Sequence, residues 1–142
     1  MGRILAIDYG KKRVGIAVSD PGKIIATGLT TVFSHEIFNY LQEYISREPV
    51  ELFVVGHPKQ LNNQDSESMT YIKPFLTGLK RKFPTIPIVM YDERFTSVLA
   101  HQALIEGGAK KKTRQDKALI DTMSATIILT SYMEQQRNLI HK

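Results

Sequence analysis

The sequence predicts an α/β fold in which helices cover both faces of a mixed five-stranded sheet. Two observations lead to this prediction. Three strand-like segments come first, and a short cationic turn joins the first two of them as in a hairpin. From residue 34 onwards, helical and strand patterns alternate as far as the last strand, which two helices follow. We therefore expect the first three strands to be antiparallel and the helices to divide between the two faces.

The first two predicted strands contain the most unusual pattern of the chain. Residues 4–10 (ILAIDYG) form an apolar run that is interrupted by Asp8 and closed by Gly10. Gly10 permits either a positive φ or a close approach of the backbone. Residues 14–19 (VGIAVS) return with period 2, and one face consists only of Gly15, Ala17 and Ser19. Asp8 either caps the turn, as Asp often does, or has a functional role.

The middle of the chain is predicted as strand, helix and strand. Residues 23–32 are rich in β-branched side chains and form the third predicted strand. Ser34 is placed to cap a helix with apolar residues at helical spacing, which Pro49 ends. The apolar run 52–55 is typical of a strand that is covered on both faces, and Gly56 stops it. Residues 57–65 are polar and are predicted to form a loop.

The last third is predicted as helix, strand and two helices. A helix over 69–83 contains Pro74, so we expect a kink or two short helices there. Residues 86–91 form an apolar strand, followed by Asp92, Glu93 and Arg94. A helix over 97–106 ends at Gly107 and Gly108, and the basic stretch 109–114 is expected to be mobile. The final helix runs over about 115–136.

Length and composition restrict the class of protein. A chain of 142 residues with 42% hydrophobic and 23% charged residues suits one domain, and we expect residues 1–142 to form it. No cysteine is present, which excludes disulfides and thiolate metal sites. No apolar run is long enough to span a membrane and no signal-peptide pattern is present, so a cytoplasmic protein is expected.

The net charge of +5 comes from clusters of basic residues that suit a polyanionic partner. Each cluster could instead be a solvated turn or helix end, but several in one small domain favour nucleic acid. The clusters comprise Lys11, Lys12 and Arg13; Lys80, Arg81 and Lys82; and Lys110, Lys111 and Lys112 with Arg114.

Three carboxylates need an explanation, because each interrupts or ends an apolar pattern. Asp8 does so in the first strand, Glu93 follows another strand, and Asp121 lies on the apolar stripe of the last helix with Ala118, Ala125, Ile128 and Tyr132. A buried carboxylate must be paired, protonated or bound to a metal, although a partly exposed stripe or turn would leave it solvated. If Asp8 and Glu93 end neighbouring strands and the last helix covers them, the three acids converge. Oxygen ligands of this kind suit Mg²⁺ or Mn²⁺.

Three motifs together resemble the YqgF/RuvX family of the RNase H-like, RuvC-related superfamily. They are IDYG with RVGIA at residues 7–17, DERFTS at 92–97 and IDTMSATIIL at 120–129. The resemblance spans nearly the whole chain and implies an RNase H-like fold with Asp8, Glu93 and Asp121 as catalytic, metal-binding acids. It implies a nuclease that matures the 5′ end of the 16S ribosomal RNA precursor, with Holliday junction resolution as the alternative activity.

Two departures from the family pattern affect the expected function. The loop after Gly56-His57-Pro58 lacks its usual second glycine, and Ser124 stands where RuvC-type resolvases carry a further acid. The second departure favours RNA over branched DNA as the substrate. We expect Lys11, Lys12, Arg13, Arg94, Lys110, Lys111, Lys112 and Arg114 to contact nucleic acid, and the protein to be a monomer or weak homodimer. A non-catalytic RNA- or ribosome-binding domain stays open as a third reading.

Overall fold

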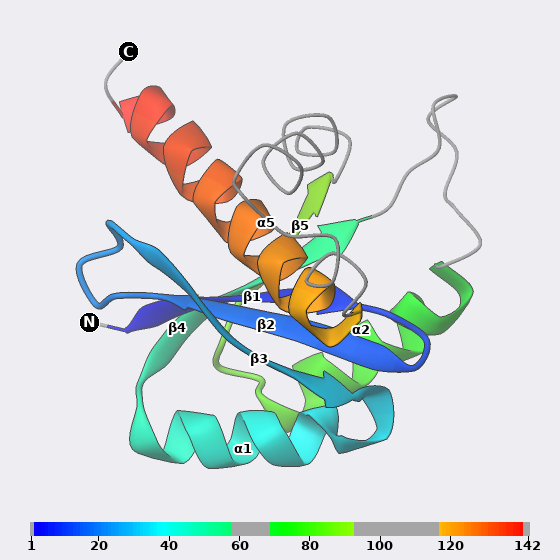
Figure 1. Cartoon of the computed structure of the whole chain (residues 1–142). Coiled ribbons are helices and arrows are strands. Elements are labelled where there is room, and N and C mark those ends of the chain that lie inside the picture. Colours follow the sequence, from blue (N-terminus) through cyan, green and yellow to red (C-terminus); the bar gives the residue numbers. More distant parts are fainter. Residues whose placement is uncertain (1, 58–68, 93–116, 141–142) are drawn as a thin grey trace.

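A five-stranded sheet with the strand order β3-β2-β1-β4-β5 forms the centre of the molecule (Figure 1). The computed structural model describes residues 2–57, 69–92 and 117–140. The strands β1 (Arg3–Tyr9), β2 (Arg13–Ser19) and β3 (Ala26–Phe33) are antiparallel neighbours. The strands β4 (Val50–His57) and β5 (Ile88–Asp92) continue the sheet in parallel with β1. The predicted mixed sheet and its antiparallel first half are confirmed.

The described helices divide between the two faces of this sheet, as predicted (Figure 1). The short 3-10 helix η1 (Ser34–Glu36), α1 (Ile37–Arg47) and α2 (Met69–Lys82) cover one face. The long helix α5 (Lys117–Ile140) crosses the other face and contacts β1, β2 and β3. We refer to these as the α1 face and the α5 face.

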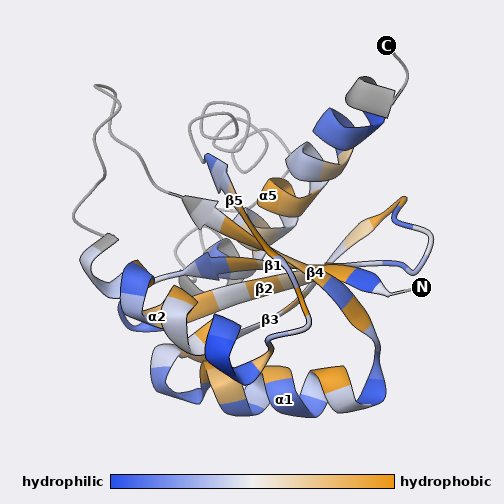
Figure 2. Ribbon diagram, turned by 180° about the vertical axis from the view of Figure 1, so that it is seen from behind, coloured by the Kyte–Doolittle hydropathy of each residue, from blue (hydrophilic) through white to orange (hydrophobic). Residues whose placement is uncertain are grey.

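Alternation along the strands produces a separate apolar core on each face. On the α1 face, Leu5, Ile7 and Ile16 pack against apolar side chains of α1 and α2. On the α5 face, Ala6 and Ala17 pack with Ala125, Ile128, Leu129, Tyr132 and Met133. Figure 2 shows the hydrophobic strands between these layers, and hydrophilic positions along α1 and α2. Three members of the apolar stripe predicted for the last helix, Ala125, Ile128 and Tyr132, are therefore buried against the sheet.

The small face of β2 explains how closely α5 approaches the sheet. A Cβ atom added to Gly15 would lie 2.0 Å from the main-chain oxygen of Asp121, far inside van der Waals contact. On β3, a Cβ atom at Gly28 would lie 2.7 Å from Cγ2 of Thr122. Glycine leaves room for the helix backbone at position 15 and for two threonine side chains of the helix at position 28.

Two local predictions around β3 need correction. The strand begins at Ala26 and not at residue 23, because the carboxylate of Asp20 accepts hydrogen bonds from the backbone N–H groups of Gly22, Ile24 and Ile25 and holds a turn there. Ser34 does not cap α1. Its hydroxyl donates to the carbonyl of Lys11 at 2.7 Å and ties the β1–β2 turn to the end of β3.

Other boundaries differ by a few residues. Residues 69–82 form one helix with Pro74 inside it, and not two short helices. His57, assigned to a loop from the sequence, is the last residue of β4. The predicted helix over 97–106, the rest of the 57–65 loop and the basic stretch 109–114 lie outside the described residues. No described helix is both long enough and apolar enough to cross a membrane.

Candidate active site at the end of β1

Asp8 lies near the carboxyl end of β1, on the α5 face. It is the register partner of Gly15 on β2, and Ala6, two residues earlier on β1, is the register partner of Ala17. Ala6 and Ala17 both belong to the core beneath α5, so alternation assigns Asp8 and Gly15 to the same face. The side chain of Asp8 is half-buried.

Asp121, the fifth residue of α5, is brought to the same place by helix packing. Its main-chain oxygen lies directly over Gly15, which is the residue opposite Asp8. The two acids are more than 110 residues apart in sequence, yet the main chain of Asp121 reaches the register partner of Asp8 because Gly15 has no side chain. The structure therefore places Asp8 and the main chain of Asp121 next to Gly15.

Arg13, which begins β2, is the ionic partner of Asp121. Its Nε donates a hydrogen bond of 2.9 Å to Oδ2 of Asp121, and the two side chains are 33% and 25% exposed. A charge-assisted hydrogen bond in this half-buried position compensates the carboxylate. Of the states open to a carboxylate on a partly buried stripe, Asp121 is thus in the paired one. Its Oδ1 accepts no hydrogen bond in the described part of the chain.

Hydroxyl contacts fix α5 on the sheet and thereby set the position of Asp121. The hydroxyls of Thr31 on β3 and Thr122 on α5 lie 2.6 Å apart. Further along, the hydroxyls of Tyr91 on β5 and Ser131 on α5 also lie 2.6 Å apart. The helix is thus anchored to strands on both sides of β1.

Glu93 lies outside the described residues and directly follows β5. The expectation that β1 and β5 are neighbours is wrong, because β4 lies between them and pairs with both. All three strands run in parallel, so their carboxyl ends share one edge of the sheet. β1 and β5 are two strand spacings apart, about 10 Å, because β4 lies between them.

The basic residues near these acids come from the β1–β2 turn. Lys11 and Lys12 are exposed there, and Gly10 closes the turn by donating its N–H to the carbonyl of Arg13 at 2.9 Å. Gly10 is required for this close approach and not for a positive φ. The cluster at residues 80–82 ends α2, whose first turns lie beside Tyr9, so it is at the other end of the sheet. Arg94, Lys110, Lys111, Lys112 and Arg114 lie outside the described residues.

The donor set at this site fits a hard divalent cation. Asp8 and Asp121 supply carboxylate oxygens at the rim of the sheet, which is the chemistry that Mg²⁺ and Mn²⁺ prefer. Within the described ranges, no three acidic or histidine side chains gather into a metal-binding group. The neighbouring Tyr9 is not part of this set, because it stacks on Phe75 on the α1 face, where burial and then the nearby Tyr71 raise the pKa of its phenol. Tyr9 therefore anchors the end of β1.

The role of Arg13 was not predicted from the sequence, which assigned it only to nucleic-acid contact. A usable signal was present. Alternation along β2 places Arg13 on the same face as Gly15 and Ala17, and that small face predicts a closely packed helix. The nearest acid on the apolar stripe of the last helix is then its natural partner.

Comparisons with known proteins agree with this arrangement. The family model described as "RuvX: Holliday junction resolvase" matches residues 2–135. Proteins named "Putative pre-16S rRNA nuclease" are similar to the chain. The one from Phocaeicola vulgatus is 60% identical over 96% of this chain and 99% of its own. The one from Parabacteroides distasonis is 61% identical over 96% and 98%.

Solved structures of RuvC from Thermus thermophilus have the same fold. One, in complex with a Holliday junction substrate, has a TM-score of 0.58 at 15% identity and covers 96% of this chain and 97% of that one. Another has a TM-score of 0.54 at 17% identity, with 94% and 96% covered. At this level of identity the likeness concerns the fold, which is the predicted RNase H-like, RuvC-related one.

Proposed function

Since the chain belongs to the RuvX family, we propose that it is a metal-dependent nuclease that hydrolyses phosphodiester bonds in the 5′-end maturation of the 16S ribosomal RNA precursor. The observation that supports this proposal is that Asp8 and the main chain of Asp121 both lie next to Gly15. Two acidic residues from distant parts of the chain thus come to the end of β1, beside a cationic turn. Folding alone does not require such a pair.

In this proposal Asp8, Glu93 and Asp121 are the catalytic acids and hold Mg²⁺ or Mn²⁺. The bound cations would activate a water molecule and stabilise the leaving oxygen of the phosphodiester. Two observations on the described residues support this. Asp8 and Asp121 lie near the carboxyl end of β1, and β5, which precedes Glu93, has its carboxyl end on the same side of the sheet.

Arg13 holds Asp121 in the absence of a cation. The guanidinium neutralises one carboxylate of a site in which like charges would otherwise repel one another. Lys11 and Lys12, exposed on the same turn, are placed to attract the phosphate backbone. Arg94, Lys110, Lys111, Lys112 and Arg114 are proposed as further backbone contacts on the strength of the sequence alone.

The proposed substrate is RNA, with residues 1–142 acting as one nuclease domain in the cytoplasm. The names of the similar proteins support ribosomal precursor RNA. The description of the family model supports branched DNA as the second candidate. Ser124, half-buried one turn after Asp121, supplies a hydroxyl where an acid would strengthen a second cation site, which favours the RNA assignment.

The test compares cleavage of a 16S precursor fragment, a four-way DNA junction and linear DNA. Cleavage of the RNA in Mg²⁺ or Mn²⁺, and its loss in chelator, is the expected result. Asp8→Asn and Asp121→Asn should abolish cleavage, whereas Glu43→Gln, a carboxylate-to-amide change on the exposed side of α1, should not. Metal-free stability of Asp8→Asn should equal or exceed that of the wild type, because the change removes a charge from the cluster. Asp121→Asn also loses the ion pair with Arg13, so it should be destabilised by less than about 1 kcal/mol.

Three results would contradict parts of the proposal. Full activity after chelation would exclude the metal-dependent reaction. Preferential cleavage of the junction would replace the RNA assignment by resolution of branched DNA. If no substrate is cut but RNA binds, the chain is the non-catalytic RNA-binding domain that the sequence left open.

A further inference from the structure

The edge strand β3 has features that the nuclease site does not use. It is the last strand on its side of the described sheet and none of its residues is fully buried, whereas six of the seven residues of β2 are. Its sequence, ATGLTTVF, contains no charged residue. Long uncharged edge strands tend to pair with another chain, and monomeric proteins usually protect them with charges or prolines.

Exposed apolar side chains mark both ends of this strand. Ile24 and Ile25 precede β3 and are 62% and 63% exposed, and Phe33 ends it and is 56% exposed. Among the described residues, these three are the large hydrophobic side chains that face solvent to this extent. All of them therefore belong to one edge.

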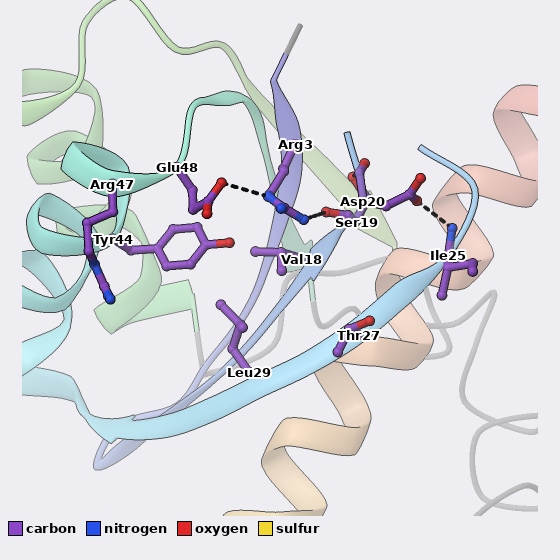
Figure 3. A pocket seen from close by; sticks show the side chains of 10 residues that line it. All are labelled: Arg3, Val18, Ser19, Asp20, Ile25, Thr27, Leu29, Tyr44, Arg47 and Glu48. Atoms are coloured by element: carbon purple, nitrogen blue, oxygen red, sulfur yellow. Dashed lines mark hydrogen bonds and ion pairs between the residues drawn. The ribbon is translucent and has the colours of Figure 1, made fainter. Parts of the chain in front are cut away.

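Two hollows lie beside the same edge. The larger, of about 490 Å³, is lined by Ile25, Thr27 and Leu29 with Tyr44 and Arg3 on the α1 face. Figure 3 shows the side chains of Tyr44, Val18 and Leu29 around it, with Arg3 held by Glu48 and the carbonyl of Ser19. The smaller, of about 210 Å³, lies at the other end and is lined by Thr31, Val32 and Phe33 with Arg13 and Glu36.

We propose that β3 pairs antiparallel with β3 of a second copy of this chain, which forms a two-fold symmetric dimer with a continuous ten-stranded sheet. Antiparallel self-pairing brings each end of the strand to the opposite end of its partner. Phe33 would lie opposite Ile24 of the partner subunit, and Val32 opposite Ile25 of the partner subunit. The exposed apolar residues then cover one another, and each hollow receives side chains from the other copy.

The side-chain faces agree with this register. Phe33 pairs with Arg13 on the α5 face, and Val32 belongs to the core on the α1 face. Ile25 lines the hollow on the α1 face, and Ile24 lies one residue closer to the turn that Asp20 holds. In this register the two-fold axis would pass between Gly28 and Leu29, and Leu29 is the extra residue of the bulge between β2 and β3.

The charges at the two ends of the strand also favour a second copy. The carboxylate of Asp20 lies at the Ile24 end, where it accepts hydrogen bonds of 2.7 Å from the N–H groups of Ile24 and Ile25. The exposed Lys12 lies at the Phe33 end, because its carbonyl accepts the N–H of Ser34 at 2.9 Å. Self-pairing places Asp20 of each copy near Lys12 of the other, which favours this partner over a chain of unrelated charge.

Sedimentation velocity on the full chain, from about 1 µM to about 500 µM, tests the proposal without any cleavage assay. A pairing of a single strand from each copy buries a small interface, so we expect a concentration-dependent dimer with a dissociation constant of about 10 µM. Ile24→Glu and Phe33→Lys should each weaken it at least about tenfold. The double variant with both changes should restore it, because the ammonium group introduced by Phe33→Lys in one copy would meet the carboxylate introduced by Ile24→Glu in the other. Asn39→Glu, an exposed change on α1, is the control and should dimerise as the wild type does.

A chain that stays monomeric over this range would overturn the proposal and leave the edge to a different kind of partner. A dimer that Ile24→Glu and Phe33→Lys do not weaken would place the interface elsewhere. If the single changes weaken the dimer and the double variant does not restore it, the proposed register is wrong. All the substituted side chains are exposed, so circular dichroism should show the variants folded.

Discussion

Replacing Gly15 by Ala tests the contact on which the candidate site depends. Gly15 lies opposite Asp8 in the β1–β2 register and beneath the main chain of Asp121. The added Cβ would lie 2.0 Å from the Asp121 oxygen and 2.4 Å from its carbonyl carbon. Ordinary contact begins at 3.4 Å, so α5 and β2 must separate by about 1.4 Å at this point.

The size of the expected destabilisation depends on the kind of atom that the added Cβ would contact. Overpacking a core costs about 1–3 kcal/mol, and a main-chain oxygen within a long helix cannot rotate away, so the upper end applies. A Gly→Ala change recovers up to about 1 kcal/mol because it restricts the unfolded chain. We expect a net loss of about 2 kcal/mol in the free energy of unfolding, which for a chain of this size lowers Tm by about 6 °C.

Gly28→Ala is the matched control, because α5 also crosses that glycine closely. There the added Cβ meets side-chain atoms, Cγ2 of Thr122 at 2.7 Å and Oγ1 of Thr126 at 2.9 Å, which can shift by small rotations. Urea unfolding and RNA cleavage should be measured for both variants. Gly15→Ala should also reduce cleavage by about 100-fold in the folded fraction, since a displacement of about 1 Å misplaces Asp121.

Two outcomes would refute this reasoning. If Gly15→Ala unfolds within about 0.5 kcal/mol of the wild type, α5 does not press on β2 as the structure has it. If it is destabilised but its folded fraction cleaves RNA at the wild-type rate, the position of Asp121 has no part in catalysis.

Three further predictions concern charge. Arg13→Gln should lower the free energy of unfolding by less than about 1 kcal/mol, because the pair of Arg13 with Asp121 is partly exposed. The affinity for Mn²⁺, measured by calorimetry, should rise because the guanidinium no longer competes for the Asp121 carboxylate. Weaker Mn²⁺ binding would contradict this prediction. Backbone hydrogen bonds from Ile25 and Ile24 hold the pKa of Asp20 below its ordinary value of 3.8. Its contribution to stability is therefore present above pH 3.8 and lost as the pH falls through the lowered pKa, so the Tm difference between wild type and Asp20→Asn should vanish in acid. Replacing Lys11 and Lys12 by Ala should weaken RNA binding equally for all sequences. The slope of log binding constant against log salt concentration should fall by about 0.7 for each lost phosphate contact. An unchanged slope would show that the turn does not contact the phosphate backbone.

Local patterns in the sequence determined most of the elements and the faces that they bury. The period-2 pattern of β2 identified a face of small residues, and the apolar stripe of the last helix identified the surface that packs on it. These predictions hold because burial repeats with the geometry of a strand or helix, which neighbouring residues alone define. The odd acids Asp8 and Asp121 were identifiable for the same reason, since each breaks a local repeat.

The tertiary structure decided what local periodicity does not encode. The insertion of β4 between β1 and β5 depends on pairing between distant strands. The sequence of a strand does not show which other strand lies on each side of it. Ser34 bonds to Lys11 and does not cap α1, because the folded chain brings a carbonyl within reach that sequence spacing does not show. Likewise, Arg13 meets Asp121 across 108 positions only once α5 has docked on Gly15. Non-local contacts of this kind depend on which surfaces fit together, and that fit exists only in the folded chain.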